Sequence, residues 1–189
     1  GTSSSWTLTA LPLFVWMGEI LFRTKLSENL FKGLSPWMQK LPGGLIHVNV
    51  VGCALFAAIS GSSAATVATV GKMSIPELRK RNYPEKILLG SLAGSGTLGL
   101  LIPPSIILII YGVAVQESIA KLFIAGIIPG IMIALIFMSY VIIWSLLNKN
   151  KMPKIIEEYT FIEKIKKSKQ LLPVIILILG VIGSIYTGI

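Results

Sequence analysis

The sequence predicts an all-α integral membrane protein with several transmembrane helices, a re-entrant helical hairpin and a discontinuous helix. Three observations support this fold class. The 189 residues are 53% hydrophobic and only 13% charged. The mean hydropathy of +0.79 suits a lipid environment better than a soluble domain. Two breaks, the small polar residues 60–63 and the pair Pro103-Pro104, interrupt otherwise long apolar stretches.

The side-chain inventory argues against an enzyme. The chain has no aspartate and contains one histidine, His47, and one cysteine, Cys53. A metal site needs a cluster of ligands and a nucleophilic triad needs a base with an orienting carboxylate, so neither is expected. His47 is therefore interpreted as a packed or interfacial residue. The net charge of +9 is assigned to lysine-rich cytoplasmic loops rather than to nucleic-acid binding.

Residues 1–40 are expected to form a first transmembrane helix and a basic connector. The apolar run 6–22 is at the short end of what crosses ~30 Å of hydrocarbon. Glu19 precedes Arg23 by four residues, the favourable order for a helical ion pair. This carboxylate is either half of a surface pair or a functional group. No basic leader precedes the run, so we expect no signal peptide, and the chain is interpreted as a fragment.

Residues 41–71 are expected to form the re-entrant hairpin. The breaker Leu41-Pro42-Gly43-Gly44 precedes an apolar arm, the small polar residues 60–63 interrupt it, and a second arm runs to Gly71. Residues 72–121 are expected to hold a discontinuous transmembrane helix and its connectors. Its centre contains Pro103-Pro104, and proline removes a donor and clashes with the preceding turn.

The rest of the chain alternates between apolar and lysine-rich segments. Residues 122–147 carry no charge and form the clearest transmembrane helix, whereas 171–189 form a last, truncated one. Residues 148–170 are expected to form a cytoplasmic amphipathic segment that lies on the membrane surface, with Pro153 in its first helical turn. Its predicted apolar face contains Met152, Ile155, Ile156, Tyr159, Ile162 and Ile165.

The distribution of lysine and arginine favours a hairpin that enters and leaves on one side. With that topology, sixteen of the seventeen basic residues lie on one side of the membrane. A hairpin that crossed fully would leave five on one side and twelve on the other. Because basic loops stay cytoplasmic, the first arrangement is preferred, and the hairpin opens toward the cytoplasm.

The two breaks together predict a transport site. Paired discontinuities in apolar helices mark the binding sites of secondary transporters, because freed backbone groups need partners. Carbonyl oxygens at the end of the first arm suit sodium, and the N–H groups of the second arm, capped by Ser62 or Ser63, suit a carboxylate. The alternative is that these small residues only allow close helix packing.

Three motifs resemble one transporter family. They are Ser-Gly-Ser-Ser-Ala-Ala-Thr-Val-Ala from Ser60, Gly-Thr-Leu-Gly-Leu-Leu-Ile-Pro-Pro-Ser from Gly96, and Leu-Phe-Ile-Ala-Gly-Ile-Ile-Pro-Gly from Leu122. Together they resemble the large membrane subunit of tripartite ATP-independent periplasmic (TRAP) transporters, over nearly the whole chain. The resemblance implies half of an inverted-repeat elevator transporter in the bacterial inner membrane. It also implies a sodium-driven importer of organic acids, of the sialic acid or dicarboxylate type, with two partners: a small membrane subunit and a periplasmic substrate-binding protein.

The same resemblance assigns residues. The sodium ion, expected as the coupling ion with no organic cofactor, would bind at five positions, largely through backbone carbonyls: Ser60, Ser62, Gly99, Ile102 and Pro104. Ser63 and Thr66 are expected to face the substrate cavity. Two other functions stay open: a different re-entrant-loop ion transporter or channel, and a non-transporting scaffold subunit.

Overall fold

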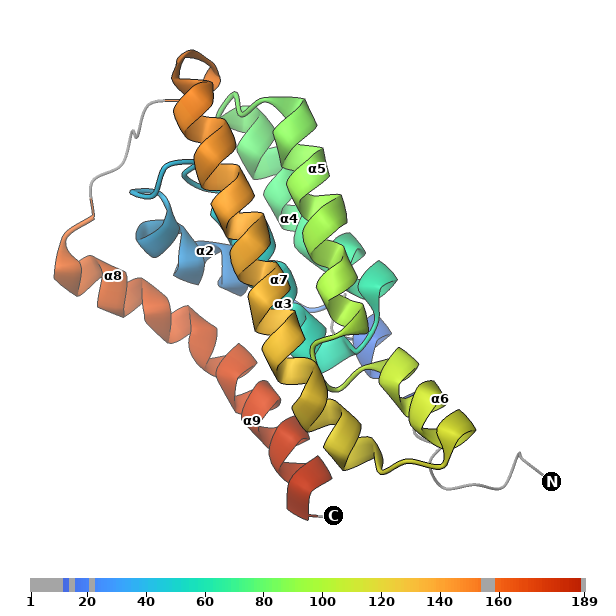
Figure 1. The fold of residues 1–189 in the computed structure, drawn as a ribbon. Helices are drawn as coiled ribbons and strands as arrows, with labels where there is room; N and C mark the ends of the chain where they lie inside the picture. The colour runs from blue at the N-terminus through green and yellow to red at the C-terminus, as the bar shows by residue number, and fades with distance from the viewer. Residues whose placement is uncertain (1–11, 14–15, 21–22, 154–158, 188–189) are drawn as a thin grey trace.

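The computed structural model describes residues 12–13, 16–20, 23–153 and 159–187 (Figure 1). All regular structure in these ranges is helical, and they contain no strand. The longest helices run beside one another as a bundle, and α2 and α8 lie together at one side of that bundle (Figure 1). Most of the predicted first span, and Ile155 and Ile156 of the predicted apolar face, lie outside the described residues.

The centre of the molecule is a helical hairpin with a third helix packed on it. The hairpin consists of α3 (Ile46–Ser60) and α4 (Ser63–Lys80), and α5 (Glu85–Gly96) packs against both. The second arm therefore continues as helix beyond Gly71, where the sequence predicts the hairpin to end. Buried side chains of α2 (Leu26–Met38), α3 and α5 form the main core, including Leu30, Phe56 and Leu88.

A second break follows α5. The chain passes through a short 3-10 helix, η2 (Thr97–Leu100), leaves helical structure, and resumes as α6 (Ile106–Val115). The predicted interruption at Pro103-Pro104 is thus present in the structure. The helix α7 (Ile119–Leu147) then runs back along the bundle, and η3 (Lys149–Lys151) follows it (Figure 1).

The structure contains one long apolar helix with little burial. Among the described residues, α7 alone is long and apolar enough to cross a membrane, judged by length and composition. Its side chains are largely exposed, for example Ile128 at 76% and Leu147 at 79%. An apolar helix with such an exposed surface is stable against lipid rather than water.

The C-terminal part begins with an amphipathic helix. The helix α8 (Phe161–Ser168) leads through η4 (Lys169–Leu171) into α9 (Leu172–Thr187). Pro153 was predicted in the first turn of the amphipathic helix, but Pro153 and Tyr159 are not helical. The start of α8 is explained by a capping box, in which the Thr160 N–H donates to Glu163 Oε2 at 2.9 Å.

Candidate functional site

Two residues reverse the chain at the tip of the hairpin. Gly61 ends α3 in the left-handed conformation, with φ of 60°, and its N–H donates to the Ala57 carbonyl at 3.1 Å. Ser62 is extended and caps α4, because its Oγ accepts from the Ala65 N–H at 3.4 Å. Of the two cap residues that the sequence left open, the structure selects Ser62.

A cluster of oxygen atoms lies directly inside the tip. Ser60 Oγ lies 2.9 Å from Thr66 Oγ1, and both side chains are fully buried. The Ser62 carbonyl accepts hydrogen bonds from Ser60 Oγ at 3.3 Å, Thr66 Oγ1 at 2.7 Å and the Thr66 N–H at 3.0 Å. The bond from the Thr66 N–H is the first of α4, and the two hydroxyls add to it on the same carbonyl.

The second break has a similar construction. The Leu98 carbonyl accepts from the N–H groups of Leu101 at 3.1 Å and Ile102 at 2.8 Å. A cis peptide bond joins Pro103 to Pro104. Ser105 then caps α6 in an extended conformation like that of Ser62, and its Oγ donates to the Leu100 carbonyl at 2.7 Å. Each break therefore ends one helix and starts the next with a serine cap.

The two breaks are in direct contact. The Ile106 N–H, at the start of α6, donates to the Gly61 carbonyl at 3.2 Å. A Cβ placed on Gly61 would lie 2.5 Å from the Pro104 oxygen. A Cβ placed on Gly99 would lie 2.8 Å from the Ser63 nitrogen. Glycine is therefore required on each side for the two backbones to approach this closely.

The structure brings most of the sequence-predicted site residues together. Ser60, Ser62 and Thr66 share one hydrogen-bond network. The Gly99 backbone abuts the Ser62–Ser63 peptide, and the Pro104 oxygen abuts Gly61. The predicted sodium site and the predicted contact between the two breaks thus occupy one location. Whether this cluster binds sodium stays a prediction.

Ile102 is placed differently. Its side chain lies against Gly130 of α7, where an added Cβ would lie 2.9 Å from Ile102 Cγ1. It also lines an apolar cavity of about 250 Å³ beside the break, together with Pro103, Pro104 and side chains of α7. Ser63 and Thr66, predicted to face the substrate cavity, do not line this cavity. The Thr66 hydroxyl faces the tip oxygens. That Ser63 and Thr66 face the substrate cavity stays a prediction.

Three residues at the site were not among the sequence predictions. Gly61 accepts the bond from α6, Ser105 is fully buried at the second cap, and Gly18 packs against the hairpin. A Cβ on Gly18 would lie 3.7 Å from that of Ser60. Ser105 had a detectable signal, because it precedes an apolar helix directly after the proline pair. The contacts of Gly61 and Gly18 join residues that are distant in the chain, so no local sequence signal announces them.

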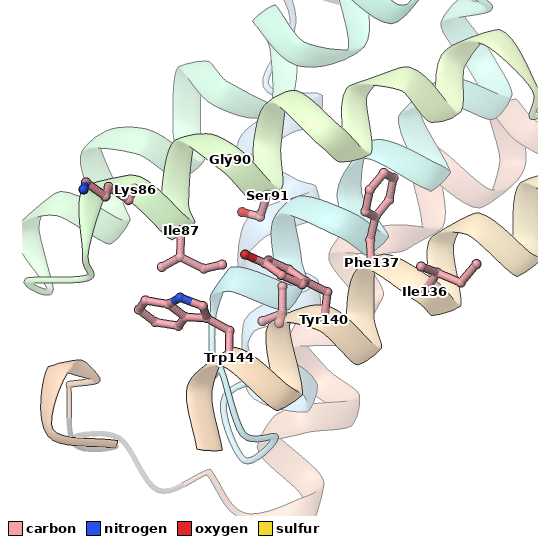
Figure 2. A pocket seen from close by; sticks show the side chains of 9 residues that line it. Lys86, Ile87, Gly90, Ser91, Ile136, Phe137, Tyr140 and Trp144 are labelled. Atoms are coloured by element: carbon pink, nitrogen blue, oxygen red, sulfur yellow. The ribbon is translucent and has the colours of Figure 1, made fainter. Parts of the chain in front are cut away.

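A separate hollow lies between α5 and α7 and has a different character. Figure 2 shows Tyr140 and Trp144 of α7 facing Ile87 and Ser91 of α5 across it. Its volume is about 540 Å³, and its lining is mainly apolar. No group of three or more His, Cys, Asp or Glu side chains able to hold a metal occurs in the described part of the chain.

Comparison with known proteins identifies one transporter family. The family described as "Tripartite ATP-independent periplasmic transporter, DctM component" matches residues 1–189. The C4-dicarboxylate TRAP transporter large permease protein DctM of Pseudomonas aeruginosa is 36% identical over 187 residues, which are 99% of this chain and 43% of that protein. The ectoine/5-hydroxyectoine large permease protein UehC of Ruegeria pomeroyi is 34% identical over 188 residues, which are 97% of this chain and 42% of that protein.

A third relative covers less of the chain. The sialic acid TRAP transporter permease protein SiaT of Haemophilus influenzae is 39% identical over 135 residues, which are 71% of this chain and 22% of that protein. The chain thus spans less than half the length of these curated relatives. They are transporter permeases and not enzymes. With this match over its full length, the chain belongs to the DctM family of TRAP transporter large permease subunits.

Proposed function

We propose that this chain is the part of a TRAP large permease that holds a coupling sodium ion during import of an organic acid. The supporting observation is the contact between the hairpin tip and the second break, where the Gly61 carbonyl meets the Ile106 N–H at 3.2 Å. Two interrupted helices that meet inside an apolar bundle are the arrangement used by secondary transporters for ions and solutes. The proposed location is the bacterial inner membrane.

The proposed sodium ligands are oxygen atoms. The tip supplies the hydroxyls of Ser60 and Thr66 and the Ser62 carbonyl, all within one network. Gly99 and Pro104 contribute backbone carbonyls from the second break. Hard cations prefer oxygen ligands, and freed carbonyls near helix ends coordinate sodium in discontinuous helices. Ile102 keeps its proposed role only through its carbonyl, since its side chain lies in apolar surroundings.

The solute is proposed to carry an acidic group. Two helices begin at the site, α4 after Ser62 and α6 after Ser105. Helix N-termini stabilise negative charge through their dipole and their unpaired N–H groups. The three relatives are named as transporters of C4-dicarboxylates, ectoine and sialic acid, so one subunit architecture serves several acids. The selecting residues are proposed to lie outside this chain.

Two partners are proposed from family membership. A periplasmic binding protein would deliver the solute, and a small membrane subunit would join the large one. The hairpin is proposed to be re-entrant and to open toward the cytoplasm, and transport is proposed to occur by an elevator motion of the hairpin and the second break. The lysine distribution supports this topology, since it keeps sixteen of seventeen basic residues on one side.

The test is uptake by the intact transporter in proteoliposomes. We expect uptake of the acid to require both an inward sodium gradient and the loaded binding protein. Uptake that proceeds equally with potassium in place of sodium would contradict sodium coupling. Ionic current without solute would favour the channel alternative. A Ser62→Leu variant, which removes the hydroxyl and crowds the tip, is expected to abolish uptake; unchanged uptake would favour a scaffold.

A further inference from the structure

The helix α8 is a basic amphipathic element far from the hairpin tip in the chain. The eight residues of α8 and the following Lys169 together contain four lysines and one acidic residue, Glu163. The carboxylate of Glu163 is engaged with the Thr160 N–H at the helix start. The charge available to a partner is therefore positive.

One face of α8 is fixed to α2 through Trp37. The Trp37 Nε1–H donates to Ser168 Oγ at 2.8 Å, and Ser168 in turn donates to the Lys164 carbonyl at 2.9 Å. Lys164 Nζ lies 5.5 Å from the centre of the indole ring, within cation–π range. The Phe161 ring meets the same indole edge-on, with centroids 6.4 Å apart. These contacts determine which face of α8 points away from the protein.

The outward face is apolar, and Phe161 lies at its edge, where its ring also meets Trp37. Phe161 is 66% exposed, Ile162 74% and Ile165 48%. At ~100° of rotation per residue, these three side chains lie on one arc of about 100°. Lys166 borders this apolar stripe, and Lys169 follows it in η4. Lys167 is turned elsewhere, since its Nζ lies 3.9 Å from the centre of the Tyr159 ring.

The position of α8 in the chain indicates what covers the stripe. Only η4 separates α8 from α9, whose residues are almost all apolar, and Figure 1 shows a bend where the two helices join. An amphipathic helix with lysines beside an apolar face, placed directly before an apolar helix, matches elements that lie in the headgroup region of a bilayer. Lysines there are attracted to anionic lipids.

We propose that α8 binds anionic phospholipid in the leaflet on the lysine-rich side of the membrane. In this arrangement Phe161, Ile162 and Ile165 enter the boundary between headgroups and acyl chains. Lys166 and Lys169 contact lipid phosphates, whereas Trp37 holds the helix to the protein body. The proposal concerns a lipid site and does not depend on sodium coupling, so its test needs no uptake measurement.

The test places a fluorescent bimane label on α8 in the intact large subunit, reconstituted in nanodiscs. One variant carries Ile162→Cys, and the matched control carries Lys167→Cys on the side of α8 that faces the Tyr159 ring. The native Cys53 is buried. The nanodiscs contain phosphatidylcholine alone or with phosphatidylglycerol, and part of the lipid carries a doxyl quencher high on the acyl chain. We expect quenching at position 162 to exceed that at position 167 by about two-fold or more.

The lipid class is tested by a charge change. In discs with phosphatidylglycerol, the double variant Lys166→Gln/Lys169→Gln is expected to lower quenching at position 162 to the level seen in phosphatidylcholine alone. The control Lys149→Gln/Lys151→Gln removes two exposed lysines of η3 and should leave the quenching at position 162 unchanged. Equal quenching at positions 162 and 167 would overturn the proposal. So would shielding of position 162 from both doxyl lipid and aqueous iodide, because protein would then cover the stripe.

Discussion

Replacing Gly61 by alanine is expected to separate the hairpin tip from the second break. At φ of 60° a residue with a side chain loses ~1–2 kcal/mol relative to glycine. The new Cβ would also lie 2.5 Å from the Pro104 oxygen. Because that oxygen is a backbone atom, a change of side-chain rotamer cannot relieve the clash. The break must shift, and the bond from the Ile106 N–H to the Gly61 carbonyl, worth ~0.5–1.5 kcal/mol, is lost.

These contributions sum to about 1.5–3.5 kcal/mol, which corresponds to a loss of roughly 10- to 400-fold in the equilibrium constant for the native contact. Gly61→Asn separates the two causes, since asparagine adopts the left-handed region more readily but keeps the Cβ. If the contact with Pro104 dominates, the asparagine variant is as defective as the alanine variant. Gly90→Ala is the matched control, because nothing lies within 4 Å of its added Cβ.

The assay is thermal unfolding of the purified intact subunit, with and without sodium. We expect a lower midpoint for Gly61→Ala and a loss of any upward shift caused by sodium. Gly90→Ala should keep or slightly raise the midpoint, because alanine is the better helix former by about 0.5–1 kcal/mol. A Gly61→Ala protein with an unchanged midpoint and an unchanged response to sodium would refute the contact as drawn.

Three further predictions follow from named contacts. Ser60→Ala should raise the sodium concentration for half-maximal uptake by about 10- to 100-fold, as expected for one lost polar contact to a charge. The control is Ser74→Ala, because the buried Ser74 hydroxyl on α4 has no hydrogen-bond partner among the described residues. Asn49→Ala should lower the free energy of unfolding, measured by denaturant titration, by about 1–3 kcal/mol. The reason is that the Asn49 amide joins α3 to α5, donating to the Leu88 carbonyl at 3.2 Å and to Ser91 Oγ at 3.0 Å. A cysteine replacing Lys80 should react with a membrane-impermeant maleimide only from the cytoplasm, and labelling from outside would overturn the re-entrant topology.

The sequence predicted the features that depend on local chemistry. The small polar run at the tip and the proline pair each interrupt a helix where expected. Ser62 caps α4, and the charge-free stretch after Leu122 forms most of α7. The pairing of Glu19 with Arg23 is also present, at 2.8 Å and with both side chains largely exposed. Caps, prolines and charge spacing act over a few residues, so a sequence reveals them.

Other features depend on contacts between distant residues. The close approach of the Pro104 oxygen to Gly61, which adds to the local need for glycine at φ of 60°, comes from a residue more than forty positions later in the chain. The position of α8 depends on Trp37, more than a hundred residues earlier. The second arm continues past Gly71 because Leu78 is fully buried in the core, so a polar stretch is still held as helix. Tertiary packing overrides local composition at such positions.

The contacts at the site also define what must move together if the hairpin moves. The bond between Ile106 and Gly61, and the contact of Gly99 with the tip, join α3, α4, α5 and the start of α6 into one body. The first half of α7 belongs to it as well, because a Cβ on Gly126 would lie 2.6 Å from the Leu101 oxygen. A closely packed unit of this kind shifts as a whole rather than deforming internally. The chain leaves this body through the lysine-rich residues between α7 and α9, which include α8. A lipid-bound α8 would therefore lie on one covalent path that leaves this body, the other being the connection from α2 into α3.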